Sequence, residues 1–329
     1  MKIINQHVLI SRTDAIGDVV LTLPMCGYLK SIHPGIRISF LGRTYTEPVI
    51  NCCAAVDNFI NYDELKKLPE AEQIVTLRAQ SIDVIIHVFP LREIGTLAKA
   101  AGIKMRVGTT NRVFHWMSCN KLVKLSRKKS PLHEAQLNIV LLQALGIKQV
   151  PDIVQLPDYY DFRVRNDLKH EYAALLYKER FNLIIHPKSH GSGREWSLQR
   201  FAELIAILPP GKFRVFISGS EKEKAVLKDW ISGLPGHVVD ITGKMPLDQF
   251  IQFIAAADGL IAAGTGPLHI AAQTGIHTLG LFPSIGSIHA RRWGPIGKQA
   301  EYIQAPGDEL DVITAEEVYK KVARWNMCI

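Results

Sequence analysis

The sequence predicts an α/β protein built from two doubly wound domains, each a parallel sheet covered by helices. Three observations predict this fold class. Short runs rich in β-branched and aromatic residues alternate with amphipathic stretches along the chain, which is typical of βαβ units and not of hairpins. A chain of 329 residues is long enough for two domains of ordinary size. The alternation pauses at residues 150–158, where two prolines occur and periodicity is weak, so we expect the domains to be connected there.

The first domain is expected at residues 1–155. Its strands are predicted at residues 7–11, 37–41, 58–60, 83–88 and 105–107. Its helices are predicted at residues 18–32, 47–53, 71–80, 93–101 and 132–145. The last of these helices ends before Gly146, a common C-terminal signal.

The second domain is expected at residues 156–314. Its strands are predicted at residues 182–185, 214–218, 238–241, 259–263 and 278–282. Its helices are predicted at residues 197–208, 221–232, 247–256 and 267–273. A final helix within residues 315–329 is expected to brace the first domain. Ligands of doubly wound sheets bind beyond the carboxyl ends of the strands, so we expect two such domains to face a central cleft.

Composition narrows the class of protein. Hydrophobic residues make up 47% of the chain and charged residues 21%, as in globular proteins. No apolar run reaches the roughly 18 to 20 residues of a membrane-spanning helix, and the first residues do not form a signal peptide, so we expect a cytoplasmic protein. The five cysteines are odd in number and form no CxxC pair, which argues against a disulfide framework and a zinc site.

The chain is basic, with a formal charge of +8. This charge suits an anionic partner, whether nucleic acid, anionic lipid or a phosphorylated substrate. One basic loop lies beside the aromatic residues Phe114 and Trp116, and either a solvated surface or a contact surface would explain it. Its members are Lys121, Lys124, Arg127, Lys128 and Lys129.

Residues 264–272 follow the apolar run 259–263 and open with Gly-Thr-Gly. A strand that turns into a helix in this way presents free backbone N–H groups and the positive end of a helix dipole, which suits a phosphate. The alternative is a tight turn in which the glycines only permit close packing. The candidate phosphate-binding residues are Thr265, Gly266, Pro267, Leu268 and His269.

A second loop, residues 186–196, follows the first predicted strand of the second domain. Arg194 can bind phosphate bidentately, Lys188 adds a point charge, and Ser189 adds a hydroxyl. We therefore predict a second phosphate-binding segment. His186 and His190 lie on this loop and not one turn apart on a helix, so no metal site is predicted. Residues 282–295, rich in arginine and aromatic residues, could flank a nucleotide or an acceptor, or be a packed surface loop.

A third loop opens the chain at residues 11–20 and places two carboxylates, Asp14 and Asp18, after the first strand. A carboxylate at such a carboxyl end could act as a general base toward an attacking hydroxyl. Asp18 could instead cap the helix or interact with its dipole. The two aspartates could also exchange these roles.

Several spaced motifs together resemble bacterial glycosyltransferase family 9, the family of the ADP-heptose:lipopolysaccharide heptosyltransferases. The resemblance extends from Val8 to about Pro295. In the first half it rests on Asp14-x-x-Gly17-Asp18 with the residues through Pro24, on Ala101-Gly102-Ile103 with Arg106-Val107-Gly108, and on His133-Glu134 with Asn138. In the second half it rests on His186-Pro187, Arg194-Glu195-Trp196-Ser197, residues 200–204, Asp240-x-Thr242-Gly243 and residues 265–272.

The resemblance implies a GT-B architecture without a cofactor or a metal. It implies that the first domain binds an acidic glycolipid or saccharide acceptor and that the second binds a nucleotide-sugar donor. Asp18 matches the proposed general base, and Arg194 matches the basic residue that meets the donor phosphates. Asp14, Lys121, Lys124 and Arg127 are the acceptor-binding candidates. With such an acceptor, peripheral contact with the cytoplasmic face of the inner membrane is also expected.

The sequence departs from the family pattern at Gly264, where relatives commonly carry an acidic residue. From the motifs and the resemblance we predict an inverting, metal-independent glycosyltransferase that moves a sugar from a nucleotide-diphosphate donor to a hydroxyl of a lipopolysaccharide core or another surface saccharide. Two alternatives remain at this point. One is a nucleotide-sugar epimerase or hydrolase, because a fold does not fix a function. The other is a nucleic-acid-binding protein that uses the basic loop with Phe114 and Trp116. Since the phosphate-binding loops lie in the other half of the chain, we expect no nucleic-acid partner.

Overall fold

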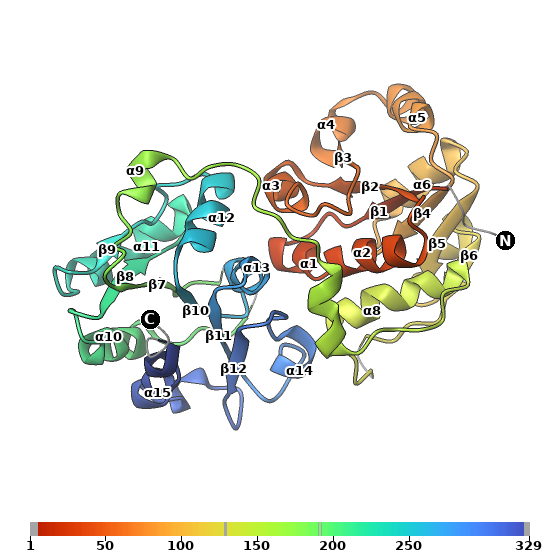
Figure 1. The fold of residues 1–329 in the computed structure, drawn as a ribbon. Helices are drawn as coiled ribbons and strands as arrows, with labels where there is room; N and C mark the ends of the chain where they lie inside the picture. Colours follow the sequence, from red (N-terminus) through yellow and green to blue (C-terminus); the bar gives the residue numbers. More distant parts are fainter. Residues whose placement is uncertain (1–5, 128–129, 190, 192, 326–329) are drawn as a thin grey trace. The chain divides into compact units, whose positions relative to one another are not determined.

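The computed structural model describes residues 6–127, 130–189, 191 and 193–325. The chain divides into two compact units, Met1–Arg163 and Val164–Ile329. Each contains a six-stranded sheet, as Figure 1 shows. Within the described residues, no helix has both the length and the apolar character needed to cross a membrane.

The first unit contains a wholly parallel sheet of strand order β3-β2-β1-β4-β5-β6. Its strands are β1 His7–Ser11, β2 Arg37–Gly42, β3 Asn58–Asn61, β4 Val84–His87, β5 Met105–Thr109 and β6 Lys121–Val123. Its helices are α1 Ile16–Val20, α2 Leu23–Ile32, α3 Glu47–Ile50, α4 Tyr62–Lys67, α5 Glu70–Ala79, α6 Arg92–Ala100, α7 His115–Ser118 and α8 Glu134–Val140. Three 3₁₀ segments complete it, η1 Thr44–Thr46, η2 Leu141–Leu145 and η3 Ile153–Tyr159.

The second unit repeats this pattern with the order β12-β11-β10-β7-β8-β9. Its strands are β7 Phe181–His186, β8 Phe213–Ile217, β9 Val239–Asp240, β10 Gly259–Ala263, β11 His277–Phe282 and β12 Ala300–Gln304. Its helices are α9 His170–Ala173, α10 Leu198–Ile207, α11 Glu221–Ser232, α12 Leu247–Ala256, α13 Gly266–Thr274, α14 Ala290–Trp293 and α15 Ala315–Trp325, with the 3₁₀ segment η4 Leu310–Val312. The strand order reverses between β1 and β4 in one sheet and between β7 and β10 in the other, and such switch points are where doubly wound sheets bind ligands.

Helices cover both faces of each sheet, which is why the central strands are apolar along their length. In the first unit, side chains from α4, α5 and α6 pack on Leu9, Leu41 and Ile85 of the sheet. In the second, α10 and α15 pack together on one face, while Phe253 of α12 lies edge-on to Phe216 of β8. Figure 1 shows α12 and α13 on the opposite side of that sheet from α10 and α15.

The predicted helix at 18–32 is two helices in the structure. α1 ends at Val20, and α2 begins at Leu23 with Pro24 in its first turn. Proline has no N–H group to continue a helix but is well suited to a first turn. The Thr22 hydroxyl also donates to the Asp18 carbonyl oxygen at 2.8 Å. The break matters because it ends α1 only two residues after Asp18.

The boundary between the units lies eight residues beyond the predicted one, at Arg163 and not at residue 155. The reason is that η3 packs on α2. A Cβ atom on Gly27 would lie 1.9 Å from the Tyr159 carbonyl oxygen, and the Tyr28 and Tyr159 rings meet edge to face at 5.1 Å. Residues 153–163 are therefore part of the first unit and not a linker.

The final helix, α15, was expected to brace the first domain, but its buried face completes the core of the second unit. Val318, Val322 and Trp325 are buried there, and Trp325 stacks on His277 with ring centroids 5.2 Å apart. Sequence periodicity gives the apolar face of a helix but not the sheet that it covers.

Candidate active site

The first loop is organised around Arg12, which follows β1 and is only 4% exposed. Its Nε donates to Asp14 Oδ1 at 2.6 Å, and its Nη2 pairs with Asp18 Oδ1. Its Nη1 lies 3.8 Å from Glu134 Oε1. A buried guanidinium needs such partners because an uncompensated charge is costly away from water. Arg12 therefore fixes both candidate carboxylates.

Glu134 and Asn138 of α8 contact both Arg12 and Arg127. The Glu134 carboxylate, 1% exposed, also pairs with Arg127. Asn138 Oδ1 accepts from Arg127 at 3.1 Å, and its Nδ2 donates to the Leu21 carbonyl oxygen at 3.0 Å. In the sequence, Glu134 and Asn138 are family motif residues, and neither is predicted as a site residue. The acidic residue directly after His133 is the signal that could have found this part of the site.

Arg127 was predicted to bind the acceptor, but in the structure it is part of this buried network. Its Nη2 also lies 3.4 Å from the Val88 carbonyl oxygen. Arg127 thus has a positioning role toward Glu134 in addition to any contact with a ligand. Lys121 and Lys124 are exposed, on β6 and just after it. Lys128 and Lys129 lie outside the described residues.

Asp14 and Asp18 both lie near the start of α1, and their side chains are about equally accessible, 20% and 21%. Neither caps the helix, because the N-cap residue is Ala15 and no side chain bonds there. Asp18 lies in the first turn, where a carboxylate interacts favourably with the helix dipole. Burial raises the pKa of Asp14, with the Arg12 guanidinium opposing that shift. The geometry places both carboxylates at the switch point and leaves the choice of base to experiment.

His87 ends β4 beside Ser11 of β1 and is 1% exposed. Within the described residues neither of its ring nitrogens has a hydrogen-bond partner. Burial, together with the nearby His115 and Arg106, lowers the pKa of His87 to about 3. The folded protein therefore keeps this ring neutral.

We expect this buried histidine to make stability depend on pH. Below its ordinary pKa of about 6.5 the unfolded chain takes up a proton that the folded protein does not, so stability falls as the pH falls from about 6.5 toward 3. The loss from this group is about 3 kcal/mol at pH 4.5. Urea unfolding at pH 7 and at pH 4.5 measures the free energy of unfolding at each pH. The difference between the two values should be about 3 kcal/mol smaller in His87→Met than in wild type. The exposed His170→Met variant is the control, and equal pH dependence in His87→Met and wild type would contradict the assignment.

In the second unit, the two predicted phosphate loops follow the neighbouring strands β7 and β10. His186 pairs in register with Ala262, so both loops leave the same edge of the sheet. They also approach closely, because a Cβ atom on Gly193 would lie 3.5 Å from the Gly264 carbonyl oxygen. His190 and Ser192 lie outside the described residues. The structure therefore brings the two predicted segments together.

Lys188 and Ser189 both contact Glu195. Lys188 Nζ lies 2.5 Å from Glu195 Oε2, and the Ser189 backbone N–H donates to Oε1 at 2.8 Å. These contacts offset the effect of burial and leave the pKa of Glu195 lowered. The family motif contains Glu195, but the sequence does not predict its role as the partner of Lys188.

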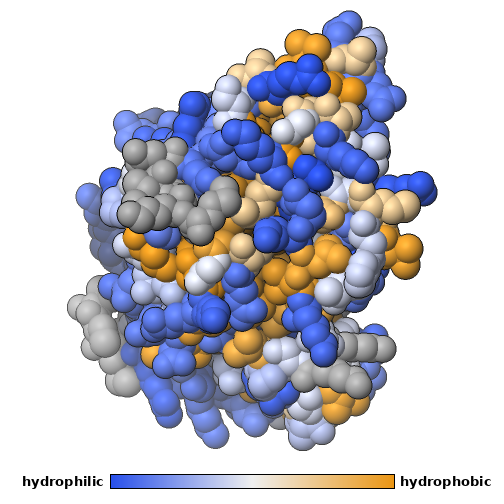
Figure 2. Space-filling view, turned by 90° about the vertical axis from the view of Figure 1, so that its right-hand side faces the viewer, coloured by the Kyte–Doolittle hydropathy of each residue, from blue (hydrophilic) through white to orange (hydrophobic). Residues whose placement is uncertain are grey.

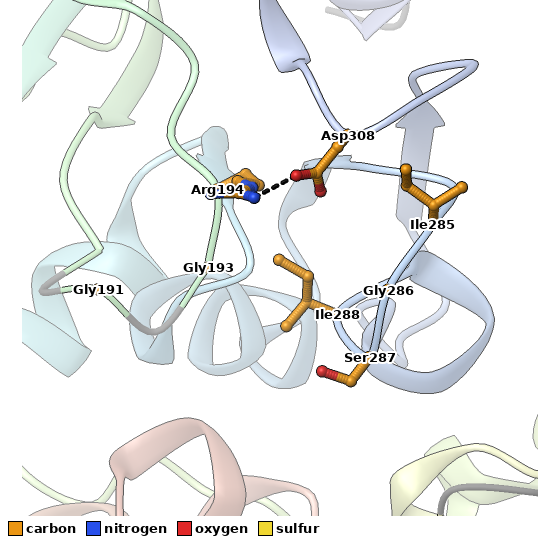
Figure 3. Close-up of a pocket in the computed structure, with 8 residues that line it drawn as sticks. All are labelled: Gly191, Gly193, Arg194, Ile285, Gly286, Ser287, Ile288 and Asp308. Atoms are coloured by element: carbon orange, nitrogen blue, oxygen red, sulfur yellow. Dashed lines mark hydrogen bonds and ion pairs between the residues drawn. The ribbon is translucent and has the colours of Figure 1, made fainter.

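Arg194 is exposed and pairs with Asp308, a residue that follows β12. Figure 3 shows this pair at one side of a pocket of about 350 Å³, with residues 285–288 opposite. The pocket is lined by Gly191, Gly193, Arg194, Ile285, Gly286, Ser287, Ile288 and Asp308. Residues 285–288 belong to the segment for which the sequence allows either a ligand-flanking loop or a packed surface loop. Their lining of the pocket favours the first.

Thr265 is the N-cap residue of α13, and Gly266, Pro267, Leu268 and His269 form the first turn of that helix. The Thr265 hydroxyl is buried, and within the described residues it has no hydrogen-bond partner. Buried hydroxyl groups normally have one. Leu268 and His269 are buried, so their side chains pack while the turn presents its backbone. The hydroxyl lies at the N-terminus of α13, the end of a helix that favours anions.

No group of three or more His, Cys, Asp or Glu side chains is placed to hold a metal ion in the part of the chain that the structure describes. The side chains gathered at the two sites are carboxylates with Arg12 in the first unit, and Lys188, Arg194 and the Thr265 hydroxyl in the second.

Comparison with known proteins agrees with the motif resemblance. The model of glycosyltransferase family 9 (heptosyltransferase) matches residues 72–322. The chain belongs to glycosyltransferase family 9. This family 9 glycosyltransferase is 28% identical over 309 residues to a glycosyltransferase candidate of Haemophilus influenzae, covering 91% of this chain and 88% of the relative. It is 22% identical to lipopolysaccharide heptosyltransferase 3 of Escherichia coli K12, over 84% of this chain and 82% of that protein.

Solved structures confirm the GT-B fold. The E. coli ADP-heptose lipopolysaccharide heptosyltransferase II superimposes with a TM-score of 0.78 at 18% identity, over 98% of this chain and 99% of that one. The predicted fold class is thus confirmed.

Proposed function

We propose that this family 9 enzyme transfers a sugar, heptose or a related one, from a nucleotide-diphosphate donor to a hydroxyl of a lipopolysaccharide core or another surface saccharide. We further propose that the transfer inverts the anomeric centre and needs no metal ion, and that it takes place in the cytoplasm. The observation that carries the proposal is the Asp18 carboxylate, held by buried Arg12 at the switch point of the first sheet.

In the proposed reaction the acceptor oxygen attacks the anomeric carbon while its proton passes to Asp18. The bond between that carbon and the diphosphate oxygen breaks at the same time, and a single displacement of this kind inverts the centre. Arg12 keeps the carboxylate oriented. Asp14, which shares Arg12 and whose pKa is raised by burial, is the alternative base.

The leaving diphosphate is proposed to bind in the second unit. Arg194 and Lys188 supply positive charge, Thr265 supplies a hydroxyl, and the first turn of α13 supplies backbone N–H groups. Arg194 and Lys188 are paired with Asp308 and Glu195, so a diphosphate must compete with or share these partners. Arg194 is the easier to recruit, because 56% of its side chain is exposed.

The acceptor is proposed to bind to the first unit, with Lys121 and Lys124 recognising its acidic groups. Activity with a nucleotide-sugar and an acceptor, measured with and without EDTA, tests the metal-independent transfer. Release of free sugar or of an isomer when no acceptor is present would instead support a hydrolase or an epimerase.

Thr265→Val gives a sharp test of the donor site. Valine keeps the shape of threonine, and the Thr265 hydroxyl has no partner to lose within the described residues. We therefore expect the free energy of unfolding to stay within about 0.5 kcal/mol of wild type. ADP affinity should fall about tenfold or more, the usual cost of a hydrogen bond to a charged group. Calorimetry with ADP measures this change.

Thr274→Val, at the other end of α13, is the matched control and should leave ADP affinity unchanged. ADP at 100 times its Kd should also stabilise the wild type by about 2.7 kcal/mol. Unchanged ADP affinity in Thr265→Val, with binding present in both proteins, would place the diphosphate elsewhere.

Gly264→Asp tests the position where the chain departs from the family pattern. A carboxylate there lies just before the N-cap of α13, where it opposes a diphosphate but can bond sugar hydroxyls. We expect it to change the ranking of donor sugars more than the affinity for ADP, and we expect the unmodified protein not to prefer ADP-heptose. Calorimetry with several nucleotide sugars measures both.

Gly264→Ala controls for crowding, since a Cβ atom there meets Phe282 Cε1 at 3.1 Å in either variant. A donor ranking that is the same in all three proteins, or a clear preference of the unmodified protein for ADP-heptose, would contradict this prediction.

A further inference from the structure

The positive charge of this chain is concentrated in one segment. No Asp or Glu occurs between Glu93 and Glu134, whereas nine lysines and arginines do. They are Lys99, Lys104, Arg106, Arg112, Lys121, Lys124, Arg127, Lys128 and Lys129. Because the formal charge of the whole chain is +8, the remainder is nearly neutral. The segment spans most of α6, β5, α7 and β6 of the first unit.

The same segment exposes large apolar side chains. Val113 is 81% exposed, Trp116 64% and Met117 60%. They lie within five residues of one another: Trp116 and Met117 are in α7, and Val113 lies just before it, with its carbonyl oxygen accepting from the Trp116 N–H at 3.1 Å. We treat these three exposed side chains as one apolar patch. Figure 2 views the molecule from the side of Figure 1 on which β6 is labelled, and shows hydrophobic and hydrophilic residues exposed next to each other. Exposed apolar groups gathered in this way usually mark a contact surface.

Basic residues lie on the segments that are bonded to this apolar patch or next to it in the chain. Lys99 Nζ donates to the Met117 carbonyl oxygen at 3.0 Å, and Arg112 precedes Val113. Trp116 Nε1 donates to the Thr110 carbonyl oxygen, and the Thr110 N–H bonds Val123, the neighbour of Lys124. The Lys104 carbonyl oxygen accepts from Asn120, the neighbour of Lys121. Within the described residues, five of these cations have no ion-pair partner, in contrast to Arg127. They are Lys99, Lys104, Arg112, Lys121 and Lys124.

We propose that this face docks on the surface of an anionic phospholipid bilayer. Val113, Trp116 and Met117 insert at the level of the headgroups, and the surrounding cations contact lipid phosphates. Tryptophan is favoured at this depth because its ring is apolar while its N–H remains polar. Each lysine or arginine near an anionic surface strengthens binding by about fivefold.

A bilayer fits this face better than a nucleic acid. Base stacking needs accessible aromatic faces, but Phe114 is half-buried and packs edge to face on His115 at 4.7 Å. Trp116 offers one exposed ring, but its exposed neighbours Val113 and Met117 have none, so successive bases find no row of rings to stack on. Exposed apolar side chains on a segment rich in lysine and arginine instead match the layered chemistry of a lipid surface.

Vesicle sedimentation tests the proposal with the full chain and without donor or acceptor. We expect binding to vesicles of phosphatidylcholine with 30% phosphatidylglycerol, and at least tenfold weaker binding to phosphatidylcholine alone. The triple variant Val113→Ser, Trp116→Ser, Met117→Ser should bind the anionic vesicles at least tenfold more weakly. The triple variant Lys99→Gln, Lys104→Gln, Arg112→Gln should lose most of the preference for anionic lipid.

Matched controls lie on other surfaces. Val75→Ser, Val154→Ser, Val226→Ser removes equally exposed apolar groups, and Lys178→Gln, Lys222→Gln, Lys228→Gln makes the same change in net charge. Both should bind as the wild type does. Absence of binding to anionic vesicles, equal losses in the controls, or tighter binding to a single-stranded oligonucleotide than to vesicles would overturn the proposal. None of the altered residues is assigned to donor or acceptor binding, so these results are independent of the proposed reaction.

Discussion

Asp18→Asn is expected to lower turnover by about 100-fold or more, because a general base contributes roughly that much and asparagine cannot accept the proton. ADP affinity should not change, since Asp18 is proposed to act on the acceptor. The fold should also persist, because asparagine still offers an oxygen to the Arg12 guanidinium. Steady-state kinetics with calorimetry of ADP binding measures these effects.

Asp14→Asn is the matched control, since Asp14 shares Arg12 and has almost the same exposure. A small effect in Asp14→Asn beside a large one in Asp18→Asn assigns the base to Asp18. The reverse pattern assigns it to Asp14. Near-normal turnover in both variants would contradict the proposal that one of these carboxylates is the general base.

Arg12→Met is expected to destabilise the protein by about 3–5 kcal/mol, the usual cost of breaking a buried ion pair. Methionine fills much of the space of arginine but leaves Asp14, Asp18 and Glu134 without its charge. The Arg12 guanidinium lowers the pKa of Asp14 against the effect of burial, so Asp14 should hold its proton to higher pH in this variant, and any residual activity that needs its carboxylate should fall off at a higher pH than in wild type. Urea unfolding and a pH–rate profile measure the two effects.

Arg43→Met is the comparison, because Arg43 pairs with Asp63 at the surface, with 43% of its side chain exposed. Its loss should cost no more than about 1 kcal/mol and leave the pH profile unchanged. If Arg12→Met and Arg43→Met lost equal amounts of the free energy of unfolding, the buried Arg12 ion pairs would contribute no more to stability than a surface pair.

The sequence predicted the two sheets because their central strands are buried on both faces and therefore form continuous apolar runs. It missed the edge strands β6 and β12. Lys121–Val123 has three residues and begins with an exposed lysine, so it was interpreted as a basic loop. Its strand conformation comes from pairing with β5, a contact that local sequence does not contain.

The position of the candidate site was largely predictable, because loops at the carboxyl ends of parallel strands meet at one edge. The partners of its charges were not. Arg194 pairs with Asp308, 114 positions away, and Arg12 bonds Asn138, 126 positions away. Such pairs depend on which helix covers which face. The roles of Asp18, Lys188 and Arg194 in catalysis and binding remain predictions.

The packing of α15 has a consequence for the order in which the protein forms. The first unit has all its strands once Arg163 has been synthesised, so it can fold while the rest of the chain is still being translated. The second unit cannot close its core until Val318, Val322 and Trp325 have emerged, because they cover the α10 side of its sheet. During that interval its apolar strands are exposed to chaperones and to other nascent chains. A chain that ends before residue 315 is therefore expected to contain a complete first unit attached to a second unit whose core is not closed.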